Sequence, residues 1–280
     1  MIYIVIPILN RLQYTIDCLN SLRTQSYLNF KIIIVDHGSS DGSSSFIILN
    51  YPEVIIIQGN INMWWAAATN LGVIRSIQLG AKYILTLNND VFAPPNYLQA
   101  LVNSAHLAPP NSLIGSTGID SGTNKVNFRG VKGNWLTLNT IYYSNIIKTR
   151  PPNGLILLEG FPGRGLLIPV AVFKKIGLYD ENYFPHYYAD DDFTLRATKA
   201  GFKVYCSWDA ELITFPNASG ASDIKNSKGI NGLFLHLTSI KGAGRLKDFI
   251  RYSIRHSPKY LIPFVLLNGT LRRVINFYRK

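Results

Sequence analysis

The chain has 280 residues, of which 47% are hydrophobic and only 16% are charged. This length suits one large domain or two small ones, and the composition excludes a wholly disordered protein. The net charge is +12, but residues 241–280 hold ten of the 28 basic residues and only one of the sixteen acidic ones. This uneven charge predicts two functions in two parts of the chain.

Two features favour a cytoplasmic protein. Residues 1–7 contain no basic leader and no cleavage site, so a signal peptide is not expected. The apolar run over residues 260–267 is far shorter than the ~20 residues that cross a bilayer. Cys18 and Cys206 are far apart in sequence, which predicts two buried free thiols and argues against a disulfide scaffold or a cysteine zinc site.

Strands and helices alternate over the first 110 residues. Asn10 is expected to cap the first helix, with Gln13 as its partner in a capping box. Nearly pure Ile, Val and Leu strands are typical of a mostly parallel sheet with helices on both faces, an α/β fold. The predicted strands are residues 3–6, 31–36, 54–57 and 83–87, and helices are predicted after Asn10, from about Ser43 and over 65–79.

Beyond residue 110 the pattern is looser. The interpretation is one domain over residues 1–240, divided into halves at 1–110 and 111–240, followed by a basic helical extension over 241–280. The expected elements are β-prone pieces at 127–129, 136–138 and 141–143, helices near 170–176 and over 193–200, and a strand at 203–206.

The extension is predicted to form two basic amphipathic helices. Apolar residues recur at helical spacing over 246–254 and over 271–278, and Pro263 and Gly269 are expected to separate the two helices. Such helices can lie on the anionic surface of a membrane. The alternatives are packing on the main domain or on a second subunit in a homodimer. No nucleic acid is expected as a partner, because no nucleic-acid motif accompanies the charge.

Polar side chains follow the predicted strands. Ligands of an open α/β sheet bind at the carboxyl ends of the parallel strands. Asp36 and Asp90 directly follow two of these strands, so their carboxylates should converge there with several amides. The alternative for Asp36, Asp41 and Asp90 is a role in a turn, which aspartate often has.

A second acidic group, Asp190-Asp191-Asp192, lies among aromatic residues. One interpretation is that these carboxylates cap a helix that starts just after them. The other is that one of them is a general base in a cleft, where burial and like charges raise its pKa.

Together these residues resemble glycosyltransferase family 2, inverting enzymes of GT-A (Rossmann-like) fold that use a nucleotide-sugar donor. Within that family the chain is most similar to bacterial enzymes of surface-polysaccharide assembly, including rhamnosyltransferase-like members. The resemblance makes 1–110 the nucleotide-binding half and 111–240 the acceptor-side half. It is carried by Val5-Ile6-Pro7 with Asn10, residues 34–43, Asn60 with Asn70, residues 87–90, 177–181 and 190–201, and it ends at about residue 219.

The resemblance implies roles for matching residues. Asp190 is the expected catalytic base, and Asp192 is the reserve candidate. Asp90 is the expected ligand of Mg²⁺ or Mn²⁺, hard cations that oxygen ligands suit. The expected nucleotide-binding residues are Pro7, Asn10, Asp36, Gly38, Asn70, Asn88 and Asn89.

Four more residues are candidates for the donor or acceptor pocket. Trp64 and Trp65 stand side by side at a loop-to-helix junction, so they cannot both face the core, and one is expected to line the pocket. Arg164 could meet a phosphate or be a surface residue. His186 could line the pocket or be a hydrogen-bonded structural histidine.

The sequence therefore predicts an inverting hexosyl- or deoxyhexosyltransferase of surface-polysaccharide synthesis. It would use a UDP- or dTDP-sugar and a divalent cation to extend a glycan or lipid-linked acceptor, in the cytoplasm or on the inner face of the cell membrane. One alternative is a sugar-phosphate nucleotidyltransferase, but residues 7–10 lack the glycine-rich phosphate loop it needs. Another is a catalytically inactive sugar-nucleotide-binding protein, because Asn88 and Ala189 replace acids of the family pattern.

Overall fold

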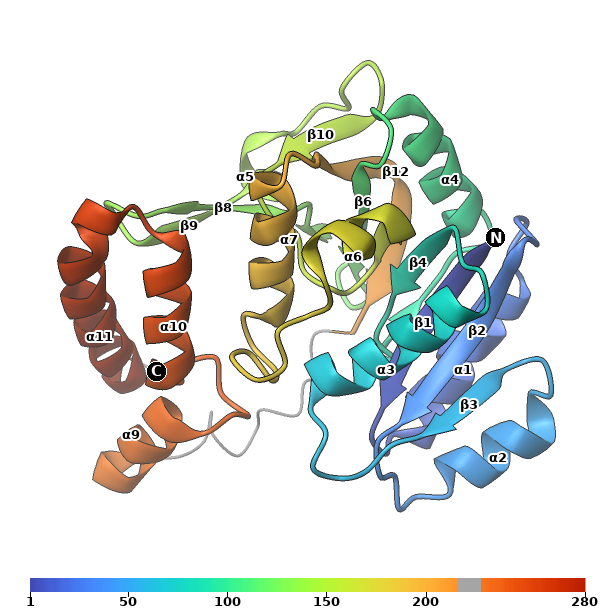
Figure 1. The fold of residues 1–280 in the computed structure, drawn as a ribbon, viewed down its shortest axis with the longest axis horizontal. Helices are drawn as coiled ribbons and strands as arrows, with labels where there is room; N and C mark the ends of the chain where they lie inside the picture. Colours follow the sequence, from blue (N-terminus) through green and yellow to red (C-terminus); the bar gives the residue numbers. More distant parts are fainter. Residues whose placement is uncertain (216–227, 280) are drawn as a thin grey trace.

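The structure, a computed structural model, describes residues 1–215 and 228–279. Within these ranges a mostly parallel sheet carries helices on both faces, and a helical unit stands beside it (Figure 1). The predicted fold class is thereby confirmed. Residues 216–227, which include the end of the family resemblance, lie outside the described residues.

The first half is the parallel part of the sheet, in the strand order β4-β1-β2-β3. β1 and most of β2 are buried, which explains their uninterrupted apolar sequences. The elements are β1 (Ile2–Ile8), α1 (Leu12–Arg23), β2 (Phe30–Asp36), α2 (Ser43–Asn50), β3 (Ile55–Gln58), α3 (Trp65–Gln78) and β4 (Tyr83–Thr86).

The second half extends the sheet with strands of both directions. β11 lies antiparallel between β4 and β6, and β12 pairs with β6 in parallel and with β10 in antiparallel direction. β5 and β7 pair with β12 and β6, and β8 and β9 form a separate hairpin. The elements are β5 (Val91–Phe92), α4 (Tyr97–Leu107), β6 (Leu113–Asp120), β7 (Val126–Phe128), β8 (Val131–Asn134), β9 (Asn139–Tyr142), α5 (Tyr143–Ile146), β10 (Leu155–Leu158), β11 (Leu166–Pro169), α6 (Val170–Ile176), α7 (Ala189–Lys199) and β12 (Val204–Thr214).

The core has a layer on each face of the sheet. α1, α2 and α4 pack on one face, and α3, α6 and α7 pack on the other. Cys18 lies in the first layer and Cys206 in the second; both are buried free thiols, as predicted.

Several elements differ from their predicted bounds, three of them as follows. β12 continues eight residues past Cys206, to Thr214. Residues 136–138 form the turn of the β8–β9 hairpin instead of a strand, with Leu138 at φ 53°. α7 begins at Ala189, so the three aspartates lie inside its first turn, where negative charge stabilises the helix N-terminus.

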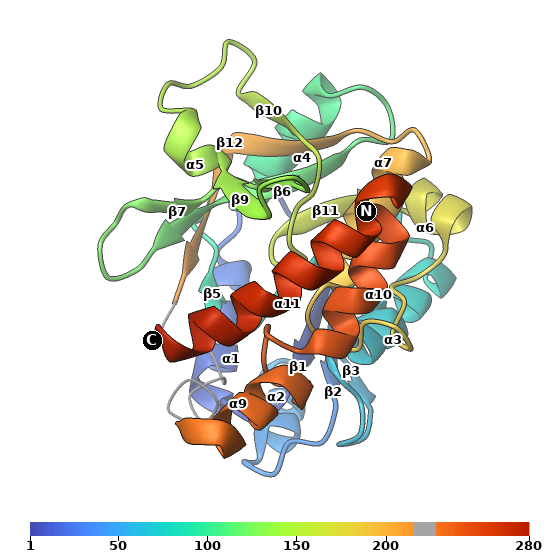
Figure 2. The same ribbon diagram turned by 90° about the vertical axis from the view of Figure 1, so that its left-hand side faces the viewer.

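The C-terminal unit consists of α9 (Gly229–Thr238), α10 (Leu246–His256), a short 3₁₀ turn (Lys259–Leu261) and α11 (Ile262–Tyr278), packed on one another beside α7 (Figure 2). The two predicted helices are confirmed, but the second starts earlier than expected. Pro263 lies in the first turn of α11, where its missing N–H costs no hydrogen bond. Gly269 lies inside α11 because α10 approaches closely; a Cβ there would stand 2.1 Å from Phe249 Cζ.

Within residues 1–215 and 228–279, no helix combines the length and the apolar character that a membrane crossing requires.

Candidate active site

The loops after β1 and β2 are joined by their polar groups. The backbone N–H of Asn10 donates to Ser39 Oγ, and Asn10 Oδ1 accepts from the backbone N–H of Ser40, both at 2.8 Å. The side chain of Asn10 makes no capping hydrogen bond to α1, contrary to the prediction. It links two loops at the carboxyl edge of the sheet instead.

Asp41 provides the cap that Asn10 does not. Its Oδ2 accepts from the backbone N–H of Leu12 at 2.9 Å, at the start of α1. Its Oδ1 accepts from the backbone N–H of Ser43 at 3.1 Å, at the start of α2. One carboxylate therefore caps two helices, which is the turn-capping alternative for this residue.

Asp36 ends β2 and is only 2% exposed. Its Oδ1 accepts from the backbone N–H groups of Gly38 at 3.1 Å and Ser39 at 2.8 Å, and its Oδ2 accepts from the hydroxyl of Ser44. Burial alone would raise the pKa of Asp36, but the hydrogen bonds outweigh it and hold the pKa below its ordinary value. Asp36 is thus a fixed negative charge at the end of this strand.

Gly38 and Pro7 shape the same edge. Gly38 has φ 117°, and a Cβ there would stand 3.0 Å from the backbone nitrogen of Ile61, so the loop needs a glycine. Pro7 is buried in β1 opposite Val35. β4 pairs with β1 only as far as Val5, so the missing N–H of Pro7 interrupts no pairing on that side.

Asp90 has a buried oxygen without a protein partner. The residue follows β4 and is 9% exposed, and its Oδ1 makes no hydrogen bond among the described residues. Its Oδ2 lies 3.8 Å from a guanidinium nitrogen of Arg11, which stands at φ 64° in the loop after β1. Because an unpaired buried carboxylate oxygen costs free energy, this position suits a cation that would pair with it.

Two of the predicted nucleotide-binding asparagines use their amides within the protein. Asn89 Nδ2 donates to Thr15 Oγ1 on α1 at 3.0 Å. Asn70 Nδ2 donates to the carbonyl of Tyr179 at 2.9 Å and to the carboxylate of Glu181 at 2.7 Å. Both side chains fix segments that surround the site.

The two adjacent tryptophans have different partners. Trp65 Nε1 donates to Asn88 Oδ1 at 3.0 Å, and its ring meets Tyr179 edge-on at 5.3 Å between centroids. The ring of Trp64 lies 5.9 Å from that of His186. Both indoles are half-buried, so each can contribute a wall to a pocket at this loop.

His186 is a half-buried imidazole next to His37. Burial lowers the pKa of His186, and the neighbouring His37 lowers it further. Its Nδ1 is buried with no hydrogen-bond partner among the described residues. His186 is therefore neutral at pH 7 and retains a ring nitrogen for a ligand.

Asp190 and Asp192 leave α7 in different directions. Asp190 Oδ2 accepts from the backbone N–H of Gly163 at 2.9 Å, and its Oδ1 accepts from the N–H of Asp191 at 3.0 Å. Burial raises the pKa of Asp190, although these hydrogen bonds and the nearby charge of Arg164 oppose the rise. Arg164 thus belongs to the surroundings of Asp190.

Asp192 is fully buried in an ion-pair network. Its carboxylate accepts from Arg196 Nε at 2.7 Å, from Arg255 Nη1 at 3.0 Å and from His256 Nε2 at 2.8 Å. Burial alone would raise the pKa of Asp192, but these partners hold it below its ordinary value. Two of the three partners belong to α10, so Asp192 fastens the C-terminal unit to the main domain, and its oxygens are occupied.

Gly163 connects the acidic group to the loop after β4. A Cβ at Gly163 would stand 2.3 Å from Trp65 Cη2 and 3.5 Å from the Cβ of Asp190. Trp65 in turn bonds Asn88, two residues before Asp90. The chain of contacts from Asp190 to Asn88 brings the two acidic segments to one site, although about 100 residues separate them in sequence.

Sequence reasoning did not single out Arg11, Gly163 or Tyr179. Arg11 adjoins Asn10, and Gly163 adjoins Arg164, so two of the three lie beside residues that were considered. Tyr179 lies within the 177–181 segment of the family resemblance, but its stacking on Phe193, 4.5 Å between centroids, is visible only in the fold.

A mostly parallel α/β sheet with an unpaired carboxylate oxygen after one strand and a second carboxylate across the site is the arrangement expected of a GT-A-type transferase. The family described as "Glycosyl transferase family 2" matches residues 3–164, more than half of the chain. The chain therefore belongs to this family and is a glycosyltransferase. Membership in this family excludes the alternative of a sugar-phosphate nucleotidyltransferase.

Several known proteins are similar. The chain is 24% identical over 285 residues to the succinoglycan biosynthesis protein ExoA of Rhizobium meliloti, covering 98% of this chain and 78% of ExoA. It is 29% identical to an uncharacterized glycosyltransferase of Rickettsia bellii over 65% of this chain, which is only 25% of that protein. The chain thus spans most of ExoA but only a quarter of the Rickettsia relative.

Solved structures show the same fold. S. aureus TarS 1–349 in complex with UDP has a TM-score of 0.57 at 14% identity, covering 99% of this chain and 72% of TarS. A second structure of S. aureus TarS 1–349 has a TM-score of 0.55 at 14% identity, covering 91% of this chain and 72% of TarS. The fold is therefore GT-A. Residues 190–192 lie beyond the matched family residues, so their roles rest on their geometry.

Proposed function

We propose that this glycosyltransferase transfers a hexose or deoxyhexose with inversion from a UDP- or dTDP-sugar to a hydroxyl group of a glycan or lipid-linked acceptor. The observation that carries the proposal is the position of the Asp190 carboxylate, which accepts a hydrogen bond from the Gly163 N–H beside Trp65. The Asp192 carboxylate, in contrast, is engaged by His256 and two arginines. Asp190 would accept the proton of the attacking hydroxyl. That oxygen bonds the anomeric carbon as the bond to the nucleoside diphosphate breaks, which inverts the configuration.

The comparisons support a place in surface-polysaccharide synthesis. ExoA, which covers nearly the whole chain, is named for succinoglycan biosynthesis. TarS, which has the same fold, is described in complex with UDP. Both are consistent with a UDP-linked donor and a polysaccharide product for this enzyme.

We also propose that Asp90 binds Mg²⁺ or Mn²⁺, which members of this family commonly use. Its unpaired buried Oδ1 fits this role. In the part of the chain that the structure describes, no group of three His, Cys, Asp or Glu could hold a metal ion. The donor diphosphate and water would complete the coordination, as is usual for Mg²⁺. The cation would offset the charge of the leaving diphosphate.

The donor class can be tested by thermal unfolding with UDP, GDP, CMP and dTDP, each with and without Mn²⁺. A ligand of the native state raises the melting temperature by mass action. We expect a metal-dependent rise with UDP or dTDP only. A rise with GDP or CMP would contradict the donor assignment, and no rise with any nucleotide would contradict nucleotide binding.

The base can be tested with Asp190→Asn, which keeps the shape of the side chain but removes its basicity. We expect turnover to fall by about 10²–10⁴-fold, the usual contribution of a general base. Asp209→Asn is the matched control, because Asp209 is paired with Arg150 at the surface. Unchanged turnover of Asp190→Asn would exclude the assigned role.

We further propose that the C-terminal unit rests on an anionic membrane surface. Five apolar residues at spacings of three and four form a stripe along α11 and are 44–64% exposed: Phe264, Leu267, Leu271, Ile275 and Tyr278. Residues 241–280 carry ten basic side chains against one acidic one, which complements anionic lipid headgroups. α10, in contrast, packs on α7 through Asp192, so the main domain covers only part of the unit.

Flotation with vesicles of phosphatidylglycerol and phosphatidylcholine tests this surface. We expect the wild type to float with these vesicles, and Leu267→Gln with Leu271→Gln to abolish flotation. Leu28→Gln with Leu49→Gln is the matched control, because both leucines are at least 80% exposed elsewhere. Unchanged flotation of the α11 variant would contradict the membrane assignment. The same holds if the wild type is a dimer and the α11 variant is a monomer, because the stripe would then be a subunit interface.

A further inference from the structure

We infer that a cavity between the β8–β9 hairpin and the C-terminal helices binds the acceptor, and that this acceptor is a saccharide bearing a phosphate group. The inference rests on the proposed function and adds the chemical class of the acceptor. The cavity has a volume of about 550 Å³. This volume is within the usual range of small-molecule sites and suits a short phosphorylated saccharide.

The cavity adjoins the proposed base. Tyr188 and Asp191, which flank Ala189 and Asp190 at the start of α7, both line it. The β8–β9 hairpin, α10 and α11 supply most of the other lining residues, and α9 contributes His236. A sugar in this cavity would therefore present its hydroxyl groups to the N-terminus of α7, where a proton must be accepted.

One wall of the cavity is aromatic. Trp135, from the hairpin turn, lies 5.8 Å from Tyr252 on α10, and Tyr252 lies 4.8 Å from Tyr188, between ring centroids. Aromatic faces offer rigid apolar area with polar tips, which suits the mixed surface of a sugar ring. The three rings come from three different segments, so only the assembled fold makes this wall.

Two arginines of α11 also line the cavity, Arg272 and Arg273. Arg273 Nη2 donates to Tyr188 Oη at 2.5 Å and its Nη1 donates to the Gly269 carbonyl at 3.0 Å. Its guanidinium lies over the Phe249 ring at 3.6 Å, and its buried Nε has no hydrogen-bond partner among the described residues. Arg272 Nη1 donates to the carbonyl of Leu138 at 2.9 Å. A guanidinium has five N–H donors, so both arginines retain donors for a ligand.

The charges around the cavity favour an anion. Asp191 is the one carboxylate among the residues that line it, and it stands at the α7 end, while Arg272 and Arg273 are adjacent on α11. Arginine binds phosphate through paired N–H donors, and a neutral glycan would leave these donors unsatisfied. A phosphate ester next to the accepting sugar meets this requirement, whether it belongs to a lipid diphosphate or to a phosphate-containing repeat.

Tryptophan fluorescence tests the inference, because Trp135 lines the cavity. The wild-type protein in excess UDP and Mn²⁺ would be titrated with the 1-phosphates of glucose, mannose and N-acetylglucosamine, and with their methyl glycosides. We expect at least one sugar phosphate to bind about tenfold or more tightly than its methyl glycoside, the size of a charged hydrogen bond. No preference for any phosphorylated sugar would overturn the inference.

Variants assign the binding to this cavity. Arg273→Gln should abolish the preference for phosphate, and Arg273→Lys should restore part of it. Asn276→Trp tests the cavity without removing an arginine, because Asn276 is exposed and lines it; the added indole should block binding. Arg279→Gln, a surface change on the same end of the chain, should behave as the wild type. Tight binding that survives both Arg273→Gln and Asn276→Trp would place the site elsewhere and overturn the inference.

Two further titrations complete the test. Inorganic phosphate that binds as tightly as the sugar phosphates would show a simple anion site and overturn the saccharide part. UDP binding, measured separately by thermal unfolding, reports on the proposed function. If UDP binds but no phosphorylated sugar is preferred, only this inference is overturned. If UDP does not bind, while phosphorylated sugars are preferred and Asn276→Trp abolishes that preference, only the donor assignment is overturned.

Discussion

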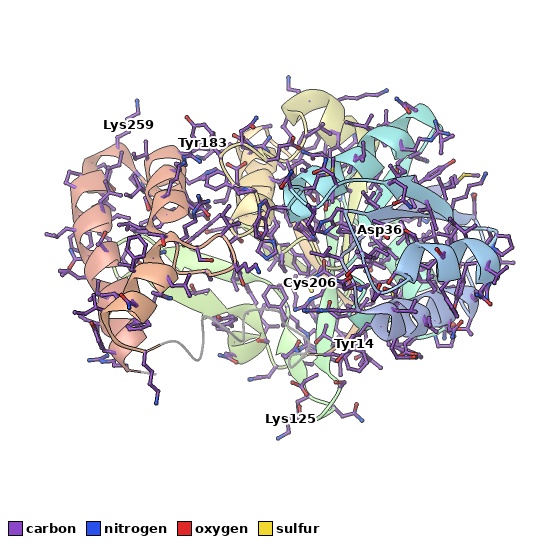
Figure 3. All side chains as sticks on the ribbon, turned by 90° about the horizontal axis from the view of Figure 1, so that it is seen from below. Tyr14, Asp36, Lys125, Tyr183, Cys206 and Lys259 are labelled. Atoms are coloured by element: carbon purple, nitrogen blue, oxygen red, sulfur yellow. The ribbon has the colours of Figure 1, made fainter. Side chains whose placement is uncertain are left out.

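Asp192 at the start of α7 and His256 at the end of α10 form a buried hydrogen bond, 2.8 Å between Oδ1 and Nε2. Arg255 reaches the same carboxylate and also pairs with Asp180 at 2.8 Å. The helix that carries the proposed base is therefore clamped to the C-terminal unit. In Figure 3, Lys259 lies at the outer end of that unit and Asp36 in the first half of the main domain, with Tyr183 between them.

The clamp should stabilise the whole chain. His256→Ala removes one of three partners of a fully buried carboxylate, and we expect it to lower the free energy of unfolding by about 1.5–3 kcal/mol. Urea unfolding measures this loss. His106→Ala is the control, because His106 is exposed on α4 and should change stability little. Equal effects of the two variants would show that the clamp contributes nothing specific.

Stability should fall on mild acidification, partly because of His256. Burial lowers the pKa of His256, against the opposing effect of Asp192, so in acid the unfolded chain takes up this proton more readily than the folded chain. The contribution is present above the unfolded pKa of about 6.5 and is lost as the pH falls toward the folded value. Urea midpoints from pH 8 to pH 5 should therefore fall more steeply for the wild type than for His256→Ala. His37 and His186 act in the same direction in both proteins, so parallel curves would contradict the assignment.

Gly163 should tolerate no side chain. In Gly163→Ala the new Cβ would stand 2.3 Å from Trp65, so the indole must move and its hydrogen bond to Asn88 must break. We expect a loss of about 1–3 kcal/mol in stability from overpacking, and a fall in turnover beyond that loss. Gly122→Ala is the matched control, because Gly122 is exposed and its Cβ would meet only Asp120 Oδ1, at an ordinary contact distance of 3.4 Å. Normal turnover of Gly163→Ala would show that the position of Trp65 is not critical.

Asp90→Asn should separate metal binding from nucleotide binding. The amide keeps the size of the side chain but removes the charge that would pair with Mn²⁺. We expect UDP to bind wild type at least about tenfold more tightly with Mn²⁺ than with EDTA, and the variant to lose this difference. Titration calorimetry measures both affinities. Asp17→Asn, an exposed change on α1, is the control and should keep the Mn²⁺ effect on UDP affinity. If Asp90→Asn also keeps this effect, Asp90 is not a ligand of the metal.

The first half of the fold was predictable because its signals are local. A strand buried on both faces needs an uninterrupted apolar run, and β1 and β2 have one. The ends of parallel strands meet at one edge, so residues that follow such runs are placed without further information. Asp36 and Asp90 were identified in this way. The cap of α1 was not, because Asp41 lies 29 residues from the N–H of Leu12 that it satisfies.

By itself, the sequence determined the parallel sheet, the buried thiols, the basic C-terminal helices and the family. Only the tertiary structure distinguished Asp190 from Asp192, because side chains two positions apart on a helix point to different sides, and what lies on each side depends on the packing. The same holds for the aromatic wall and the arginines of the proposed acceptor cavity, which come from segments about 20 to 140 residues apart. Local patterns place residues along an element, whereas the partner that each side chain meets depends on how the elements pack.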